Sequence, residues 1–297
     1  MINSYAMMFG SKPKTTPHSP LEKGENPELD TSKFLGERGK QIYMSLIGSL
    51  QWSISIGRLD ILVAVMTLSS FREFPRKGHM DRAKRVIGYL ARFKDGSIRF
   101  RAEEPNYIEL PKQDLDWATT VYGKGKDLMP KDDPVPLGKP VTMTHYYDAN
   151  LYHDMVTGRS VSGVLHLINQ TPIDWYAKKQ ATVETATYGS EFIAARICVD
   201  QIVDFRVTLR YLGVPVRVCY MFGDNESVIG SSSIPHAKLH KRHNALSFHR
   251  VREAMACGFV KCFHLRSAHN PADILSKHWG YQQVKDMLYP LLYKRGN

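Results

Sequence analysis

Large apolar residues in the first third of the chain recur at intervals of three and four positions. This spacing places them on one face of a helix and predicts amphipathic helices that pack through that face. The clearest stripe consists of Tyr43, Leu46, Ile47, Leu50 and Ile54. Similar patterns predict helices over 61–71 and 81–93, and a short strand over 98–101. We therefore expect a small helical segment over 41–101.

Two stretches lack such a pattern. Residues 1–40 contain four prolines, many lysines and few large apolar residues, so we expect a weakly packed, flexible N-terminal segment. Residues 102–140 contain six prolines and the run Gly-Lys-Gly-Lys at 123–126. Long stretches of this kind mark domain boundaries or inserted loops, so 102–140 is predicted to be a linker.

The second half of the chain alternates short apolar runs with helical patterns. Strands are predicted over 141–147, 161–168, 173–176, 214–222 and 259–265. Helices are predicted over 183–212, 225–231, 240–256, 272–278 and 281–293. Three strands, a helix, a strand, helices, a strand and a terminal helix predict an α/β domain with a mixed sheet over 141–295.

Four carboxylates in this half lie at positions where a structural and a functional interpretation compete. Asp148 lies at or near the end of the first strand, where a turn-forming aspartate is the better interpretation. Glu191 lies in line with the core-facing stripe of the long helix, so it is either a buried acid in need of a partner or an acid near the positive helix start. Asp224 follows a buried strand and is equally suited to an N-cap. Asn270 could be an N-cap with Pro271 at the first helical position, which would place Asp273 near the start of that helix.

The four acids carry more information together than singly. A strand aspartate, a helix glutamate, an aspartate at a central strand end and an aspartate opening a late helix could converge on one sheet edge. Hard divalent cations prefer oxygen ligands, and two such ions about 3.5–4 Å apart can activate water and stabilise a leaving oxygen in phosphodiester cleavage.

The order of the motifs resembles the end of the polyprotein of copia-type retrotransposons. Residues 43–50 and 83–90 are similar to the segment beyond the polymerase palm. Six further motifs fall in the family's order: Tyr-Asp-Ala-Asn at 147–150, Gly-Arg-Ser-Val-Ser-Gly at 158–163, Trp-Tyr-Ala-Lys-Lys-Gln at 175–180, Tyr-Gly-Ser-Glu-Phe at 188–192, Gly-Asp-Asn-Glu-Ser at 223–227 and Ala-Asp-Ile-Leu-Ser-Lys at 272–277.

This resemblance implies a ribonuclease H-like α/β fold, a mixed sheet with flanking helices, preceded by a helical remnant of the reverse transcriptase. It implies cleavage of the RNA strand of RNA–DNA hybrids, with two Mg²⁺ or Mn²⁺ ions held by Asp148, Glu191, Asp224 and Asp273. It also implies a reverse transcriptase palm domain as partner in the parent polyprotein. The family's turn with paired aspartates is missing from this sequence, so polymerase activity is not expected of this chain alone.

The charge balance adds a polyanionic partner to this picture. The chain has 40 Lys+Arg against 29 Asp+Glu, a formal charge of +11, and a pI near 9.4. Basic tracts are expected to contact the hybrid backbone, although a solvated helix face explains any single residue equally well. The candidates are Lys178, Lys179, Lys241, Arg242, His243 and Arg250. His269, in the loop before Asp273, could assist proton transfer or simply be a solvent-exposed loop residue.

Several alternatives remain open at this point. The chain could be an inactive nucleic-acid-binding remnant, or an integrase or transposase of the same fold, although that class has its glutamate last and this chain has it second. A zinc site is a further alternative, formed by His236, His240, Cys257 and Cys262, but its spacing is poor. The four cysteines are too few for a disulfide framework, and no apolar run reaches membrane-spanning length. We expect an intracellular protein, in the cytoplasm, in virus-like particles or in the nucleus.

Overall fold

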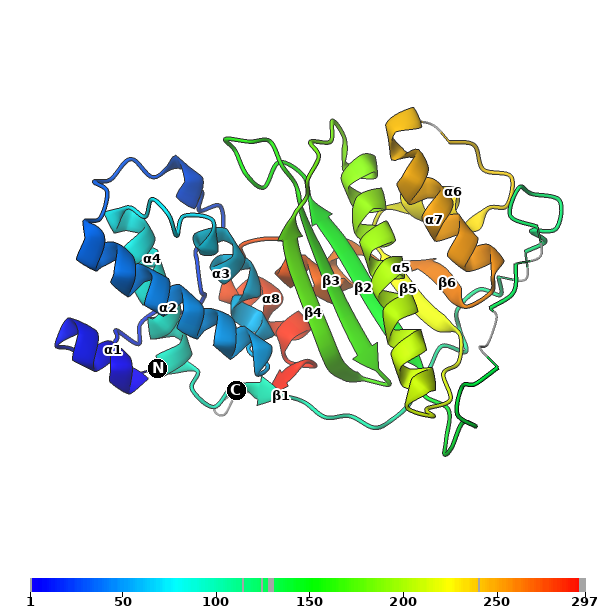
Figure 1. The fold of residues 1–297 in the computed structure, drawn as a ribbon, viewed down its shortest axis with the longest axis horizontal. Helices are drawn as coiled ribbons and strands as arrows, with labels where there is room; N and C mark the ends of the chain where they lie inside the picture. Colours follow the sequence, from blue (N-terminus) through cyan, green and yellow to red (C-terminus); the bar gives the residue numbers. More distant parts are fainter. Residues whose placement is uncertain (1, 114, 124, 128–130, 240, 294–297) are drawn as a thin grey trace.

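A mixed five-stranded sheet forms the centre of the molecule (Figure 1). The computed structural model describes residues 2–293 apart from 114, 124, 128–130 and 240. The strands are β2 (Met143–Asn150), β3 (Val161–Ile168), β4 (Thr171–Lys179), β5 (Cys219–Gly223) and β6 (Val260–His264), and they lie in the order β4-β3-β2-β5-β6. β4, β3 and β2 are antiparallel neighbours, whereas β2, β5 and β6 run parallel. This confirms the predicted ribonuclease H-like mixed sheet.

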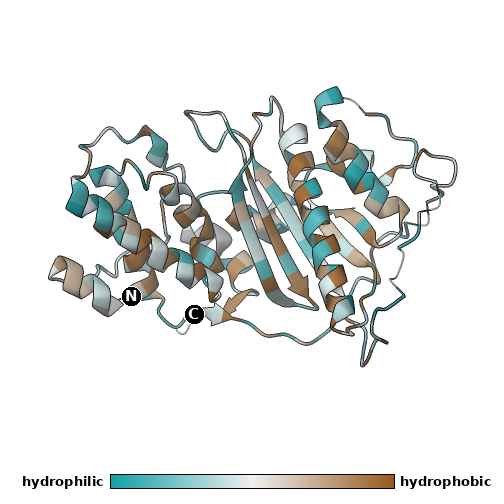
Figure 2. Ribbon diagram, viewed as in Figure 1, coloured by the Kyte–Doolittle hydropathy of each residue, from teal (hydrophilic) through white to brown (hydrophobic). Residues whose placement is uncertain are grey.

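One face of the sheet is covered by the long helix α5 (Thr187–Tyr211), with α7 (Ala245–Ala256) packed against α5 and α6 (Glu226–Ser233) against α7. The core on this side contains Val164 of β3, Tyr147 of β2 and the predicted stripe residues Ala195, Cys198 and Ile202 of α5. Figure 2 shows apolar residues along the strands and mixed polarity along α5, as expected of a helix with one buried face.

On the other face of the sheet, the end of the chain packs against β2 and β3, and one helix of an N-terminal helical layer contacts β4. The helices are α1 (Ile2–Phe9), α2 (Glu37–Ser55), α3 (Leu62–Ser69) and α4 (Lys77–Arg92). Leu165 and Leu167 of β3 share a core with these helices and with the segment around α8 (Tyr281–Leu288). The short strands β1 (Ser97–Ile98) and β7 (Leu292–Tyr293) pair with each other and join the two ends of this layer. The domain limits at 40, 101 and 140 stay predictions.

The N-terminal layer is held to the sheet by specific polar contacts as well as by apolar packing. The indole Nε1 of Trp175, on β4, donates to the carbonyl of Ile54 at 3.1 Å. Inside the layer, the carboxylate of Asp60 accepts hydrogen bonds from the Arg58 guanidinium and, at 2.7 Å, from the Tyr89 hydroxyl. Residues 58–61 are therefore a buried turn whose charge is fully paired.

The segment before α2 packs more closely than its composition predicted. Tyr5 and Leu21 are buried in the core that the helices share, and Arg82 and Arg85 of α4 form ion pairs with Asp30 and Glu22. A few well-placed apolar residues are enough to dock a chain whose average composition is polar. The flexibility expected for 1–40 stays a prediction.

The proline-rich stretch 102–140 runs along the surface of the sheet domain. Trp117 is buried against Arg252 of α7, whose guanidinium lies 4.9 Å from the indole centroid and donates to the carbonyls of Ser231 and Ile234. Tyr107 stacks near Tyr220 and Phe222 of β5. This stretch therefore covers a sheet surface with its aromatic residues rather than only spanning two units.

Several predicted elements have different bounds or types. β2 extends to Asn150, so Asp148 lies within the strand and not after it. The predicted strand 214–222 begins at Cys219, because Pro215 has no N–H to donate and only Val216 bridges to Val141. The expected helix 272–278 is a 3₁₀ helix, η5 (Pro271–Leu275). The helix predicted over 240–256 begins only at Ala245, after a 3₁₀ turn, η3 (Arg242–Asn244). The helix predicted over 281–293 ends at Leu288.

Within the described residues, every helix is too short or too polar to cross a bilayer. The cysteines are all free thiols, and Cys198, Cys219 and Cys262 are buried in the core beneath α5.

Two histidines face each other inside this core. His145 and His166 are opposite residues of β2 and β3, both fully buried, with their Nδ1 atoms 2.7 Å apart. His166 Nε2 lies 3.0 Å from the Gln201 amide oxygen. If His166 donates to Gln201, its Nδ1 accepts from His145, and both rings are neutral. Burial lowers the pKa of His166 to about 4 and holds that of His145 well below 6.5.

We expect this histidine pair to make the protein acid-sensitive. Because the folded-state pKa values are depressed, the stabilisation is complete above about pH 6.5 and is lost as pH falls towards 4. The lowered pKa of His166 alone corresponds to about 3 kcal/mol. Between pH 7 and pH 4.5, a His145→Leu/His166→Leu variant should lose less of its free energy of unfolding than the original chain does, as measured by urea unfolding. The exposed His236→Gln serves as control, and equal losses in all three proteins would contradict the assignment.

Candidate metal centre

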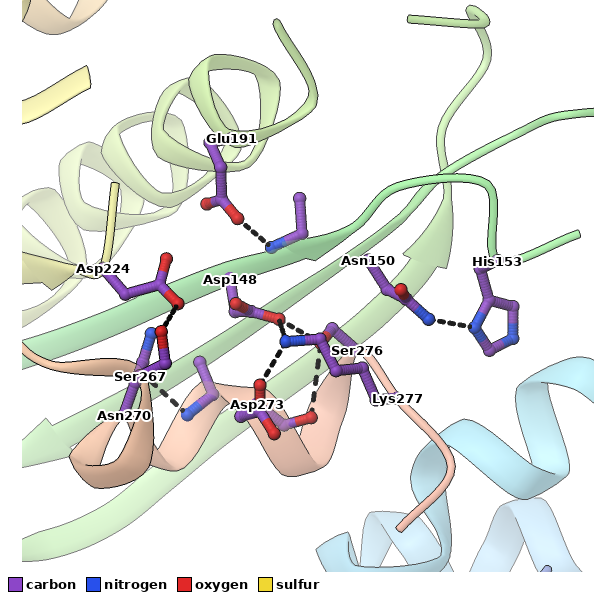
Figure 3. Close-up of polar contacts among 12 residues, drawn as sticks. Asp148, Asn150, His153, Glu191, Asp224, Ser267, Asn270, Asp273, Ser276 and Lys277 are labelled. Atoms are coloured by element: carbon purple, nitrogen blue, oxygen red, sulfur yellow. Dashed lines mark hydrogen bonds and ion pairs between the residues drawn. The ribbon is translucent and has the colours of Figure 1, made fainter. Parts of the chain in front are cut away.

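The four predicted acids lie at the edge of the sheet where the parallel strands β2 and β5 end (Figure 3). Asp148 projects from β2, Glu191 from the second turn of α5, and Asp224 follows β5 directly. Asp273 lies in η5, which packs against β2 and β3. The carboxyl ends of parallel strands are the usual place for ligands in such sheets. The tertiary structure therefore gathers acids that are far apart in the sequence.

Three of these acids form a compact group. Asp148, Glu191 and Asp224 each offer a carboxylate oxygen, and these oxygens lie within 4.8 Å of one another. Asp148 is 1% exposed and Glu191 4% exposed, while Asp224 is half-buried. Glu191 Oε1 accepts a hydrogen bond from the backbone N–H of Ala149 at 3.0 Å. Asp148 Oδ1 and Glu191 Oε2 are buried and have no hydrogen-bond partner among the described residues.

Burial and mutual repulsion shift the ionisation of this group. Burial, reinforced by Asp148 and Asp224, raises the pKa of Glu191 well above its usual value. Burial raises the pKa of Asp148 to about 6, against the opposing effect of the Lys277 ammonium. Unpaired carboxylates in such a place are costly, and a divalent cation is the partner that an all-oxygen group of this kind favours. The residues present therefore fit a magnesium or manganese centre.

Asp273 stands apart from the group of three. Its Oδ1 forms an ion pair with the ammonium of Lys277, four residues later, and the same ammonium lies 3.4 Å from Asp148 Oδ2. The Ser276 hydroxyl donates to that Asp148 oxygen as well. Neither Lys277 nor Ser276 was a predicted site residue, although both lie in the motif at 272–277. The spacing of Asp273 and Lys277 was a usable signal, because side chains four apart can meet on a helical turn.

Local packing fixes the segments that carry the acids. Asn270 caps η5 through the Ala272 N–H, as predicted, and its amide also donates to the Tyr147 carbonyl next to Asp148. Gly163 of β3 lets η5 approach, since a Cβ there would lie 2.7 Å from the Leu275 backbone carbon. The Ser267 hydroxyl donates to Asp224 Oδ2 at 2.6 Å, and Asn225, not Asp224, caps α6. Asp224 is therefore left for the centre.

The predicted nucleic-acid-binding residues divide between two surfaces. Lys178, Lys179, His243 and Arg250 line one groove of about 980 Å³ between β4, the start of α5 and α7, whereas Lys241 lines a separate hollow beside α6. The charges of Lys179 and Arg250 are paired with Asp154 and Asp200. Exposed Lys178 has no ion-pair partner in the described part of the chain. Arg242 is exposed in η3 between these surfaces.

The remaining candidates are placed as follows. His269 ends η4 (Ser267–His269) and is exposed, on the loop that leads to η5. Of the residues suggested for zinc, His240 lies outside the described residues, and Cys262 is buried within β6. Among the described residues, Asp148, Glu191 and Asp224 form the only group with metal-ligand geometry. The role of His269 stays a prediction.

Proteins homologous to this chain are retrovirus-related Pol polyproteins from plant transposons. That of transposon TNT 1-94 from Nicotiana tabacum is 26% identical over 275 residues, 91% of this chain and 18% of that protein. That of RE1 from Arabidopsis thaliana is 25% identical over 276 residues, 91% of this chain and 16% of that protein. The chain thus spans less than a fifth of the length of these relatives. No family model matches.

Solved ribonuclease structures also resemble part of the chain. RNase H1 from Halobacterium salinarum NRC-1 matches 49% of this chain and 98% of its own, at 13% sequence identity and a TM-score of 0.36.

A divalent cation should stabilise the folded protein through the three grouped acids. Ligand present at about 100 times its Kd adds about 2.7 kcal/mol of stability. We expect Mg²⁺ or Mn²⁺ to raise the melting temperature above that in EDTA, and Glu191→Gln to remove this gain without lowering the stability of the metal-free protein. Differential scanning fluorimetry tests this, with the exposed Asp204→Asn as matched control. A full metal-dependent gain in Glu191→Gln would argue against the centre.

Proposed function

We propose that this chain hydrolyses the RNA strand of RNA–DNA hybrids at the centre formed by Asp148, Glu191 and Asp224, with Asp273 as the fourth acid. The observation that carries this proposal is the convergence of three carboxylates at the carboxyl edge of a mixed sheet, two of which have a buried oxygen with no partner in the described part of the chain. Similarity to retrovirus-related Pol polyproteins over 91% of the chain supports it.

The proposed reaction is a phosphodiester hydrolysis. A water oxygen bonds to phosphorus, the bond to the ribose O3′ breaks, and O3′ takes up a proton, which leaves a 3′-hydroxyl and a 5′-phosphate. Two Mg²⁺ ions bound by the four acids would supply a water of lowered pKa and neutralise charge on the phosphate. Four oxygen-rich side chains provide the hard ligands that these ions prefer.

The chain's own residues have distinct tasks in this proposal. The Ala149 N–H holds Glu191 Oε1, whereas Oε2 is buried and has no hydrogen-bond partner among the described residues. Ser267 holds Asp224 in the same way. The family resemblance implies that Glu191 would also contact the attacking water and the 2′-hydroxyl, the group by which RNA differs from DNA. Exposed His269 is a candidate to protonate the leaving oxygen or to assist product release.

The groove beside α5 is the proposed binding site for the backbone of the RNA–DNA hybrid. Buried Gln180 connects its floor to the centre, because its amide donates both to Ser162 of β3 and to the Ser190 carbonyl, one residue before Glu191. Cationic side chains on the rim would contact phosphates without reading sequence. In the longer polyproteins the proposed partner is a reverse transcriptase palm domain, which would deliver the hybrid inside the cell.

The decisive assay uses a labelled RNA–DNA hybrid with Mg²⁺, Mn²⁺ or EDTA, and a DNA duplex for comparison. We expect metal-dependent cutting of RNA in the hybrid alone. Asp224→Asn should lower the rate by more than about a hundredfold, because losing a direct ligand exceeds the usual effect of an outer-shell change. Asp204→Asn should cut normally. Binding without cutting under any metal would identify an inactive remnant and refute the catalytic proposal.

Lys178 offers a separate test of the groove. In EDTA, so that no cutting occurs, Lys178→Ala should weaken hybrid binding and reduce the slope of log affinity against log salt by about one, because one phosphate contact is lost. Exposed Lys94→Ala, in the N-terminal layer, is the matched control for removal of one charge. Fluorescence anisotropy at several salt concentrations gives both quantities. An unchanged slope for Lys178→Ala would place the hybrid elsewhere.

A further inference from the structure

Lys277 brings a positive charge to the part of the centre that the three grouped acids leave open. Its ammonium is 3.4 Å from Asp148 Oδ2 and ion-paired with Asp273 Oδ1, so it bridges the two acids (Figure 3). Asp273 does not belong to the compact group of Asp148, Glu191 and Asp224. The fourth acid is therefore occupied by a cation that the chain itself supplies.

The bridging position is built into the local fold. Asn270 ties the start of η5 to the Tyr147 carbonyl, and the Ser276 hydroxyl donates to the Asp148 oxygen that faces Lys277. The backbone before Lys277 is therefore fixed against β2. The Lys277 side chain itself is 36% exposed, whereas that of Asp148 is 1% exposed. The ammonium can leave towards solvent while the acid cannot.

The ammonium of Lys277 between Asp148 and Asp273 affects how many divalent ions the four acids can neutralise. Four ionised carboxylates, one ammonium and one divalent ion sum to one negative charge, whereas a second divalent ion would make the same set positive. Without the ammonium, two divalent ions would balance the four acids. Lys277 and a second ion thus compete for Asp148 and Asp273, at distances where like charges repel strongly.

We propose that Lys277 is the resident counter-ion of the second metal position, so that the free protein holds one divalent ion and admits a second only when Lys277 leaves Asp273. This inference rests on the proposed function, because it presumes a first ion at Asp148, Glu191 and Asp224. A phosphodiester entering the centre brings negative charge, which favours both the second ion and an ammonium that has moved to the phosphate. Lys277 thereby couples full loading of the centre to arrival of substrate.

Metal stoichiometry in the absence of substrate tests the proposal directly. We would titrate each folded protein with Mn²⁺ and count bound ions by electron paramagnetic resonance. The original chain should bind one ion tightly. Lys277→Met should bind two, the second at least about tenfold more tightly than any further ion in the original chain, because a nearby positive charge is gone. Exposed Lys285→Met, in α8, should leave the count at one.

Replacing Asp273 provides a second test, first in the original chain and then in Lys277→Met. In the original chain, Asp273→Asn should leave the single ion in place, because Asp273 pairs with Lys277 and not with that ion. In Lys277→Met, adding Asp273→Asn should return the count from two to one. If Lys277→Met fails to fold, judged by circular dichroism, Lys277→Gln and the Asp273→Asn comparison still decide the question.

The outcomes separate this inference from the proposed function. A count of two in the original chain that falls to one in Asp273→Asn would overturn the role of Lys277, as would a count that stays at one in folded Lys277→Met. Asp224→Asn should abolish the first ion. Its failure to do so would instead refute the metal centre at Asp148, Glu191 and Asp224, whatever Lys277 does.

Discussion

The gathering of three carboxylates, two of them buried, at one sheet edge is the constraint on which the site depends. Asp148 and Glu191 are nearly inaccessible to water, each keeps an oxygen with no hydrogen-bond partner among the described residues, and each has a raised pKa. Like charges at this distance in a poorly solvated place oppose folding unless a cation or a proton compensates them. The surrounding structure must therefore hold the acids together against their own repulsion.

The supports are found on every element that carries an acid. α5 is the longest helix of the described residues, and its apolar stripe anchors Glu191 over the sheet. η5 is pressed onto β3 where Gly163 leaves room, and β5 approaches Tyr147 at Gly223, where a Cβ would lie 2.3 Å from the ring. Backbone and core atoms make these contacts, which keeps them rigid. The free-energy cost of holding the acids close together is therefore offset by packing contacts throughout the fold.

Covering both sheet faces is part of the same arrangement. β3 directs Val164 towards α5 and Leu165 towards the N-terminal layer, so one strand contributes to two cores. The layer also reaches the loop after β2, where the Thr67 hydroxyl lies 3.3 Å from His153 and the Glu28 carboxylate accepts from the Met155 N–H. The helical segment is thus in direct contact with the loop that follows Asp148, which connects it physically to the centre.

The sequence by itself determined the order of the elements, because strands and helices follow from short-range periodicity that each segment carries alone. The inward stripe of α5 that includes Glu191, the cap formed by Asn270 and the bounds of β3 were all predicted in this way. The element pattern suggested that the four acids could converge on one sheet edge, and the resemblance to copia-type polyproteins implied that they bind metal ions. Their proposed roles stay predictions.

Only the tertiary structure decided which groups meet. It grouped Asp148 with Glu191 and Asp224, set Asp273 apart with Lys277, and separated Lys241 from the groove lined by Lys178 and Arg250. It also brought the proline-rich stretch 102–140 against β5 through Tyr107 and against α7 through Trp117. Contacts of this kind depend on strand register and on packing between distant segments, and neither is encoded in the local pattern of apolar and polar residues.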